Sequence, residues 1–152
     1  MANLHVHLTG ERLDIPALDR ALPDNLSVGG IASFTGRVRK SEDLTALELQ
    51  HHPVMTEPAL RSIGESALDR FSLTALLIAH RHGRMPPGEP IVHIIAQAPH
   101  RRAALDAVAF TIDVLKTEAP FWKREWRGDS AVWIEPTSTD HREANQWLET
   151  GT

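Results

Sequence analysis

Lys116 and Lys123 bracket a short segment that combines charge with aromatic side chains. Of the 16 basic residues in the chain only three are lysine, the third being Lys40, and all others are arginine. Arginine stays protonated in proteins, whereas a partly buried lysine can lose its proton and act as a nucleophile or an acid/base. The pair therefore predicts proton-transfer chemistry. The simpler alternative is two solvated side chains, one at a helix end and one on an amphipathic strand.

Two further groups of basic residues suit an anion such as phosphate. His100 and Arg101 follow a strand-like segment and precede a helical one, where free backbone N–H groups and the helix dipole favour negative charge. Arg37 and Arg39 alternate along a strand and would project from one face. Ordinary surface charge at a loop, and a solvated edge strand, are the competing explanations.

Charge is unevenly distributed along the chain. The net charge is −4, which argues against a general nucleic-acid partner. Residues 101–127 nevertheless hold six Lys/Arg and four acids, as a local anion site would. Phe121 and Trp122 lie between the lysines, where they can either stack on a flat heterocycle or simply belong to the core.

Several chemistries are excluded by missing residues and motifs. The chain has no cysteine, so disulfides, thiolate nucleophiles and cysteine-ligated metals are ruled out, and any sulfur used must come from elsewhere. The nucleophile-elbow, P-loop and dinucleotide-binding motifs are missing as well. No apolar run is long enough to span a bilayer, and residues 1–14 do not resemble a signal peptide, so we expect no membrane association and a cytoplasmic location.

The nine histidines raise the alternative of a metal site. His5 with His7, and His80 with His82, have a strand spacing that would put both rings on one side, but neither pair implies a third ligand. We therefore expect no metal and no other cofactor.

Length and periodicity predict one α+β domain covering residues 1–152, with a largely antiparallel sheet and packed helices. We expect Thr56 to cap the first helix. In the helix expected at 103–118 we expect an apolar stripe of Leu105, Val108, Ala109, Ile112 and Leu115. Lys116 follows Ile112 by four residues and so lies at the border of this stripe, with a buried stem and a head free to reach a cleft. Helices are expected at 56–71, 103–118 and 140–148, and strands at 28–35, 44–49, 73–79, 90–98, 121–126 and 131–135.

The order and spacing of several blocks are similar to those of the large, catalytic subunit of molybdopterin synthase. The most distinctive block is Leu-Lys-Thr-Glu-Ala-Pro-Phe-Trp-Lys-Arg-Glu at 115–125. The other matching blocks are Phe-Thr-Gly-Arg-Val-Arg at 34–39, Met-Thr-Glu at 55–57, His-Arg-His-Gly at 80–83, Pro-Gly-Glu at 87–89, His-Arg at 100–101, and Trp133.

The resemblance implies an α/β-hammerhead-like fold and an enzyme that adds two sulfurs to cyclic pyranopterin monophosphate, giving molybdopterin. The sulfur would arrive as a thiocarboxylate on the C-terminal Gly-Gly of a small ubiquitin-like partner. The large subunit would form a homodimer with one small subunit at each end, a heterotetramer. A pterin- or partner-binding module of the same fold without catalysis is the alternative.

The resemblance also implies site residues. Lys116 and Lys123 would be catalytic, with Lys116 near the entering tail of the partner. Substrate binding would involve Arg37, Val38, Arg39, His100, Arg101, Lys116, Lys123, Arg124 and Glu125. The chain departs from the family pattern at 40–44, which is shorter than usual, at His52 and Val54, which replace an aromatic residue and a glycine, and at Arg37, where lysine is frequent.

Overall fold

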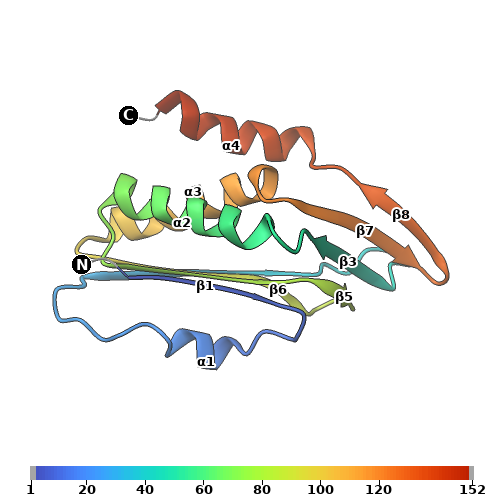
Figure 1. Cartoon of the computed structure of the whole chain (residues 1–152), viewed down its shortest axis with the longest axis horizontal. Helices are drawn as coiled ribbons and strands as arrows, with labels where there is room; N and C mark the ends of the chain where they lie inside the picture. Colours follow the sequence, from blue (N-terminus) through green and yellow to red (C-terminus); the bar gives the residue numbers. More distant parts are fainter. Residues whose placement is uncertain (1–2, 151–152) are drawn as a thin grey trace.

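The computed structural model describes residues 3–150 and contains two four-stranded sheets (Figure 1). In the first sheet, β1 runs parallel to β4, and the other pairs are antiparallel. Its strand order is β1 (Asn3–Thr9), β4 (Ala75–Arg81), β6 (Pro90–Ala98) and β2 (Gly30–Arg37). The second sheet is antiparallel throughout. Its order is β5 (Gly83–Met85), β3 (Ala46–His51), β7 (Phe121–Arg127) and β8 (Ser130–Ile134).

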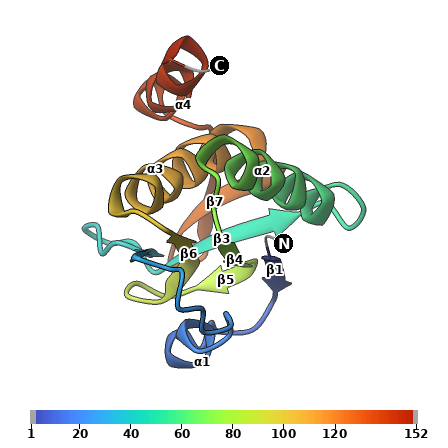
Figure 2. The same cartoon turned by 90° about the vertical axis from the view of Figure 1, so that its left-hand side faces the viewer.

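Helices cover both faces of the first sheet (Figures 1 and 2). Helices α2 (Thr56–Phe71) and α3 (Arg101–Glu118) pack on one face, and the short α1 (Ile15–Asp19) lies on the other. Every residue of β6 is buried, because this central strand is covered on both sides. The larger core cluster lies between this sheet and the α2–α3 layer.

Helix α4 (Ser138–Thr150) forms an outer layer on α3. Trp147 docks it: the indole ring packs edge-on against Phe71 and Phe110, with centroids 5.9 and 5.6 Å away, and its Nε1–H donates to Asp113 at 2.8 Å. In residues 3–150, no helix is long and apolar enough to cross a membrane.

A partly buried chain of polar contacts fastens α1 to the back of the sheet. His93 on β6 is 2.7 Å from Asp19 through Nε2 and 2.7 Å from Thr35 through Nδ1. Because a carboxylate only accepts, Nε2 carries a proton that it donates to Asp19, and the Thr35 hydroxyl pairs with Nδ1. The imidazole, which is only 2% exposed, therefore has partners at both nitrogens.

The sequence prediction of an α+β fold with largely antiparallel sheets is confirmed. The helix at 56–71 and the strand at 90–98 match the structure, and the remaining expected elements begin and end within a few residues of their positions. Strand β1, helix α1 and strand β5 were not predicted. The alternation of Leu4, Val6 and Leu8, which pack on the main core, was the available signal for β1.

The expectation that Thr56 caps α2 is wrong. Met55 occupies the cap position and makes no side-chain cap bond, while Thr56 is already helical. Its hydroxyl oxygen accepts from the N–H of His52 at 2.7 Å and donates to the carbonyl of Pro120 at 2.8 Å. The bond to the Pro120 carbonyl ties the start of α2 to the turn that separates Lys116 from Lys123.

Candidate active site

A pocket of about 620 Å³ opens where the two sheets meet the C-terminal end of α3. Its walls come from β2 and the loop after it, from β3, from α3, from β7 and β8, and from the start of α4. Its charged lining consists of four cations and two carboxylates: Arg37, Arg39, Lys116, Lys123, Glu125 and Asp140. The pocket therefore suits an anionic ligand of small-molecule size.

Both lysines of the conspicuous pair line this pocket. Lys116 lies in the last turn of α3, the helix ends at Glu118, and the chain returns along β7 with Lys123 facing inward. Lys116 keeps solvent contact through the pocket, but the walls around it displace water. This desolvation, reinforced by the charge of Lys123 and opposed by Asp140, lowers the pKa of Lys116 below its usual value. A lowered pKa makes a neutral amine easier to reach.

Asp140 supplies a counter-charge that the sequence did not reveal. Partial burial would raise its pKa, but hydrogen bonds from Thr137 and the charges of Lys116 and Lys123 outweigh that effect and hold the pKa below its usual value. The N–H of Thr137 donates to its carboxylate at 2.9 Å. Asp140 reaches the pocket only because α4 folds back over α3, so no local sequence signal marks it.

Strand alternation divides the residues around Lys123. Lys123 and Glu125 face the pocket, whereas Arg124 points to the opposite side of the sheet. There Arg124 donates to Glu48 at 2.9 Å and stacks over Trp133 at 4.6 Å. The hydrogen bond from Arg124 is the main cause that lowers the pKa of Glu48. Arg124 was predicted to bind substrate, and the structure does not place it in the pocket.

The loop that carries Arg37 and Arg39 is braced by the turn before β6. The N–H of Val38 donates to the Glu89 carbonyl at 2.9 Å, and Gly88 donates to the Val38 carbonyl at 2.7 Å. Arg37 adds a bond from Nε to the Gly88 carbonyl at 2.9 Å. The backbone N–H of Val38 is thus already used, and its buried side chain contributes an apolar wall.

His80 and Phe121 form an aromatic floor. Their rings stack with centroids 4.1 Å apart and an interplanar angle of 20°. His80 is only 4% exposed, and its Nδ1 lies 2.9 Å from the carbonyl of Arg81. Burial lowers its pKa to about 4 despite that bond, and the charges of Lys116 and His82 act in the same direction.

The sequence analysis placed His80 in one of the matching blocks, but the one chemical role it suggested for this residue was half of a metal-ligand pair with His82. In the structure the two rings have different partners, because His82 stacks on His51 with centroids 3.9 Å apart. Over residues 3–150, no three potential ligands converge on a point that could hold a metal ion.

His100 and Arg101 lie at the other end of α3. His100 occupies the N-cap position without a side-chain cap bond, both residues are exposed, and neither lines the pocket. At about 1.5 Å per residue, the helix separates Arg101 from Lys116 by about 22 Å. The two predicted anion-binding groups therefore occupy separate places on one chain.

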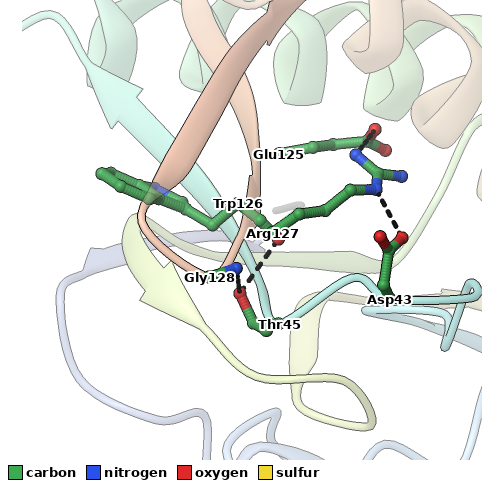
Figure 3. A network of polar contacts seen from close by, with 6 residues as sticks. All are labelled: Asp43, Thr45, Glu125, Trp126, Arg127 and Gly128. Carbon is green, nitrogen blue, oxygen red and sulfur yellow. Dashed lines mark hydrogen bonds and ion pairs between the residues drawn. The ribbon is translucent and has the colours of Figure 1, made fainter.

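The β7–β8 hairpin is tied to residues 43–45, at the end of the loop that follows Arg39 (Figure 3). Arg127 donates through Nε to Asp43 at 3.0 Å and through Nη1 to Glu125 at 3.3 Å. Thr45 donates to the Trp126 carbonyl at 3.0 Å and accepts from the N–H of Gly128 at 3.1 Å. Glu125, a pocket residue, thus shares a guanidinium with this loop.

Comparison with known proteins assigns the chain to a family. The family model described as MoaE protein matches residues 8–118. The chain belongs to the MoaE family. A relative from Mesorhizobium japonicum, named molybdopterin synthase catalytic subunit, is 42% identical over 88% of this chain and 84% of its own length. A Pseudomonas aeruginosa relative with the same name is also 42% identical, over 82% of this chain and 85% of its own length.

Solved MoaE structures have the same fold. The molybdopterin biosynthesis MoaE protein from Burkholderia ambifaria superposes with a TM-score of 0.81 at 38% identity, covering 97% of this chain and 99% of the other. Molybdopterin synthase from Staphylococcus aureus gives a TM-score of 0.78 at 27% identity, covering 84% and 95%. The resemblance inferred from the sequence blocks is confirmed.

Proposed function

We propose that this MoaE protein is the catalytic subunit of a molybdopterin synthase, an enzyme of molybdenum cofactor biosynthesis. It transfers sulfur twice to cyclic pyranopterin monophosphate and so forms molybdopterin. The observation that carries the proposal is the cationic pocket in which Lys116 and Lys123 meet Arg37 and Arg39 in a chain without cysteine. Such a pocket binds a phosphate-bearing heterocycle but must receive its sulfur from outside.

The sulfur donor is a small ubiquitin-like subunit ending in a Gly-Gly thiocarboxylate. A solved Helicobacter pylori complex of subunits 1 and 2 of molybdopterin-converting factor contains a chain of similar fold, with a TM-score of 0.71 at 20% identity. We propose that the donor's extended tail enters the pocket beside Lys116. An anionic thiocarboxylate is attracted there by two ammonium groups.

Each pocket residue has a role that suits its chemistry. Arg37 and Arg39 hold the phosphate, because planar guanidinium groups donate two parallel hydrogen bonds to its oxygens. Lys116, whose pKa is lowered, orients the thiocarboxylate and moves protons. Lys123 assists it and contacts the substrate, and Glu125 lies beside Lys123.

His100 and Arg101 act in the same reaction only from a second copy of the chain. About 22 Å of helix separates Arg101 from Lys116, which is too far for one small substrate to touch both. We propose that the protein works as a homodimer, within a heterotetramer, in which these two residues complete the pocket of the partner copy.

Two further proposals concern the chain as a whole. Residues 1–152 act as one domain, because the pocket takes its walls from both sheets and from α3 and α4. The protein works in the cytoplasm, which cell fractionation can test.

Reconstitution with a thiocarboxylated donor subunit and cyclic pyranopterin monophosphate tests the reaction. The wild-type protein is expected to form molybdopterin, and Lys116→Ala to lower the rate at least 100-fold, as loss of an acid/base group does (~10²-fold). Product formation by Lys116→Ala at the wild-type rate would remove the catalytic role of Lys116. The alternative, a binding module without catalysis, is excluded by one complete turnover of the wild-type protein.

A further inference from the structure

His80 differs from the charged groups of the pocket. The four cations can only donate hydrogen bonds or attract anions. The two carboxylates already accept bonds, Glu125 from Arg127 at 3.3 Å and Asp140 from Thr137 at 2.9 Å. His80 offers an uncharged acceptor.

The orientation of the imidazole follows from its one hydrogen bond. A carbonyl oxygen only accepts, so the Nδ1 of His80, 2.9 Å from the Arg81 carbonyl, carries the ring proton. Nε2 then carries no proton, and its lone pair can accept a hydrogen bond. It has no hydrogen-bond partner among the described residues, and it is not sealed from solvent. Since this buried ring lines the pocket, its remaining open edge faces the cavity.

The ring is held in that orientation and in that charge state. Phe121 stacks on it at 4.1 Å, and the bond to Arg81 prevents a ring flip without loss of a partner. Burial and the nearby charge of Lys116 keep its pKa near 4, so the ring stays neutral at physiological pH. A neutral lone pair repels a phosphate or thiocarboxylate oxygen and attracts an N–H group.

We propose that Nε2 of His80 accepts a hydrogen bond from an N–H of the pterin ring, and so determines which way the substrate enters. The N–H edge of the pterin points to the His80–Phe121 floor, and the phosphate lies toward Arg37 and Arg39. This inference rests on the proposed function, since it presupposes a pterin substrate. It makes His80 a specificity-determining residue for flat heterocycles that carry a donor edge.

Binding of two probes separates this role from phosphate recognition: cyclic pyranopterin monophosphate and a pterin without phosphate. His80→Phe retains the stack on Phe121 but has no acceptor. His80→Asn can retain the bond to Arg81 through its amide N–H, but its side chain is too short to bring the amide oxygen to the position of Nε2. Both are expected to weaken both probes by about 3- to 10-fold, the value of one hydrogen bond. His80→Gln, which returns an acceptor, is expected to recover part of the loss. Arg39→Ala, the matched control, should weaken only the phosphate-bearing probe.

Unchanged binding of the phosphate-free pterin by both His80→Phe and His80→Asn would overturn the proposal, and so would a loss limited to the phosphate-bearing probe. Thermal unfolding identifies a variant that has not folded, and if His80→Phe is such a variant, the Asn and Gln pair decides. Turnover by the wild-type protein is measured separately. A wild type that makes molybdopterin while its His80 variants bind normally refutes this inference alone. A wild type that binds neither probe refutes both this inference and the proposed function.

Discussion

Lys123 lies close enough to Lys116 to disfavour a second positive charge beside it. Replacing Lys123 by Ala removes that repulsion, so the pKa of Lys116 should rise toward its usual value. If the reaction needs neutral Lys116, the limb of the pH–rate profile on which activity increases with pH moves to higher pH. The measurement is the position of that limb, because the amplitude also reports substrate binding. Lys40→Ala, outside the pocket, should leave the limb in place, and an unmoved limb in Lys123→Ala would contradict the prediction.

His80 links pocket chemistry to acid stability. Its pKa is about 4 in the folded protein and 6.5 when unfolded, so between these values the unfolded chain binds more protons. Stability contributed by the neutral ring is complete above about pH 6.5 and is lost as the pH falls toward 4. We expect about 2 to 3 kcal/mol less stability at pH 4.5 than at pH 7 from this group.

Urea unfolding of the wild type and His80→Phe at the two pH values measures this contribution, because the phenylalanine variant has no proton to bind there. Replacement of the exposed His141 by Ala is the matched control. Equal pH dependence in wild type and His80→Phe would show that His80 is not the group responsible.

Residue types allowed part of the site to be predicted. The rarity of lysine pointed to Lys116 and Lys123, and alternation placed Arg37 near Arg39. The same alternation turns Arg124 away from the pocket of its own chain, an orientation that strand periodicity applied to 121–126 would have predicted. The place of Asp140 in the pocket and the acceptor role that we propose for His80 could not be predicted, because both depend on contacts between segments far apart in the sequence.

At the scale of elements, α4 controls whether Asp140 reaches the lysines. Trp147→Ala removes the packing against Phe71 and Phe110 and the bond to Asp113. Loss of a large, partly buried aromatic side chain is expected to cost about 2 to 4 kcal/mol and to loosen α4. In the Trp147→Ala variant, amide hydrogen exchange along α4 should be faster than in the wild type, and this increase should be larger in α4 than in β6.

Leu148→Ala is the matched control, because this neighbouring side chain is 75% exposed. It should leave exchange in α4 unchanged. If Trp147→Ala protects α4 as well as the wild type does, the helix is held by contacts other than its tryptophan.

Local patterns predicted the elements that have strong periodicity or punctuation. Pro120 ends α3 where expected, and the glycine turn at 128 joins β7 to β8. Helix α1 was not predicted, because its five residues are too few to show a helical periodicity. The role of Thr56 was misjudged because its hydroxyl bonds Pro120, a partner that only the tertiary fold brings near.

At the scale of the whole molecule, a shared pocket makes a quantitative prediction for mixed dimers. Lys116→Ala chains and Arg101→Ala chains are each expected to be nearly inactive alone. After random mixing in equal amounts, about half of the dimers are mixed, and each of these has one intact pocket and one with both defects. Activity should return to about one quarter of the wild-type value per chain.

Separately purified homodimers kept from exchanging are the control and should show no recovery. Activity of the mixture no higher than the average of the two variants would mean that Arg101 does not serve a neighbouring pocket.

The fold class could be predicted from one chain because periodicity and composition act locally. The separation of His100 and Arg101 from the lysine pocket could not be predicted from the sequence. It depends on α3, which holds its two ends about 22 Å apart.

The bonds of Thr45 to Trp126 and Gly128, and of Arg127 to Asp43, have a consequence for loop engineering. They anchor the downstream end of residues 40–44 to the hairpin, and Val38 is anchored to the turn before β6, so added or deleted residues must be absorbed between Arg39 and Glu42. Altering the length of this loop would thus displace a guanidinium while the lysines stay in place. If the proposed roles hold, loop length becomes a means of adjusting how deeply a phosphate is held, independently of the two lysines that we propose handle sulfur.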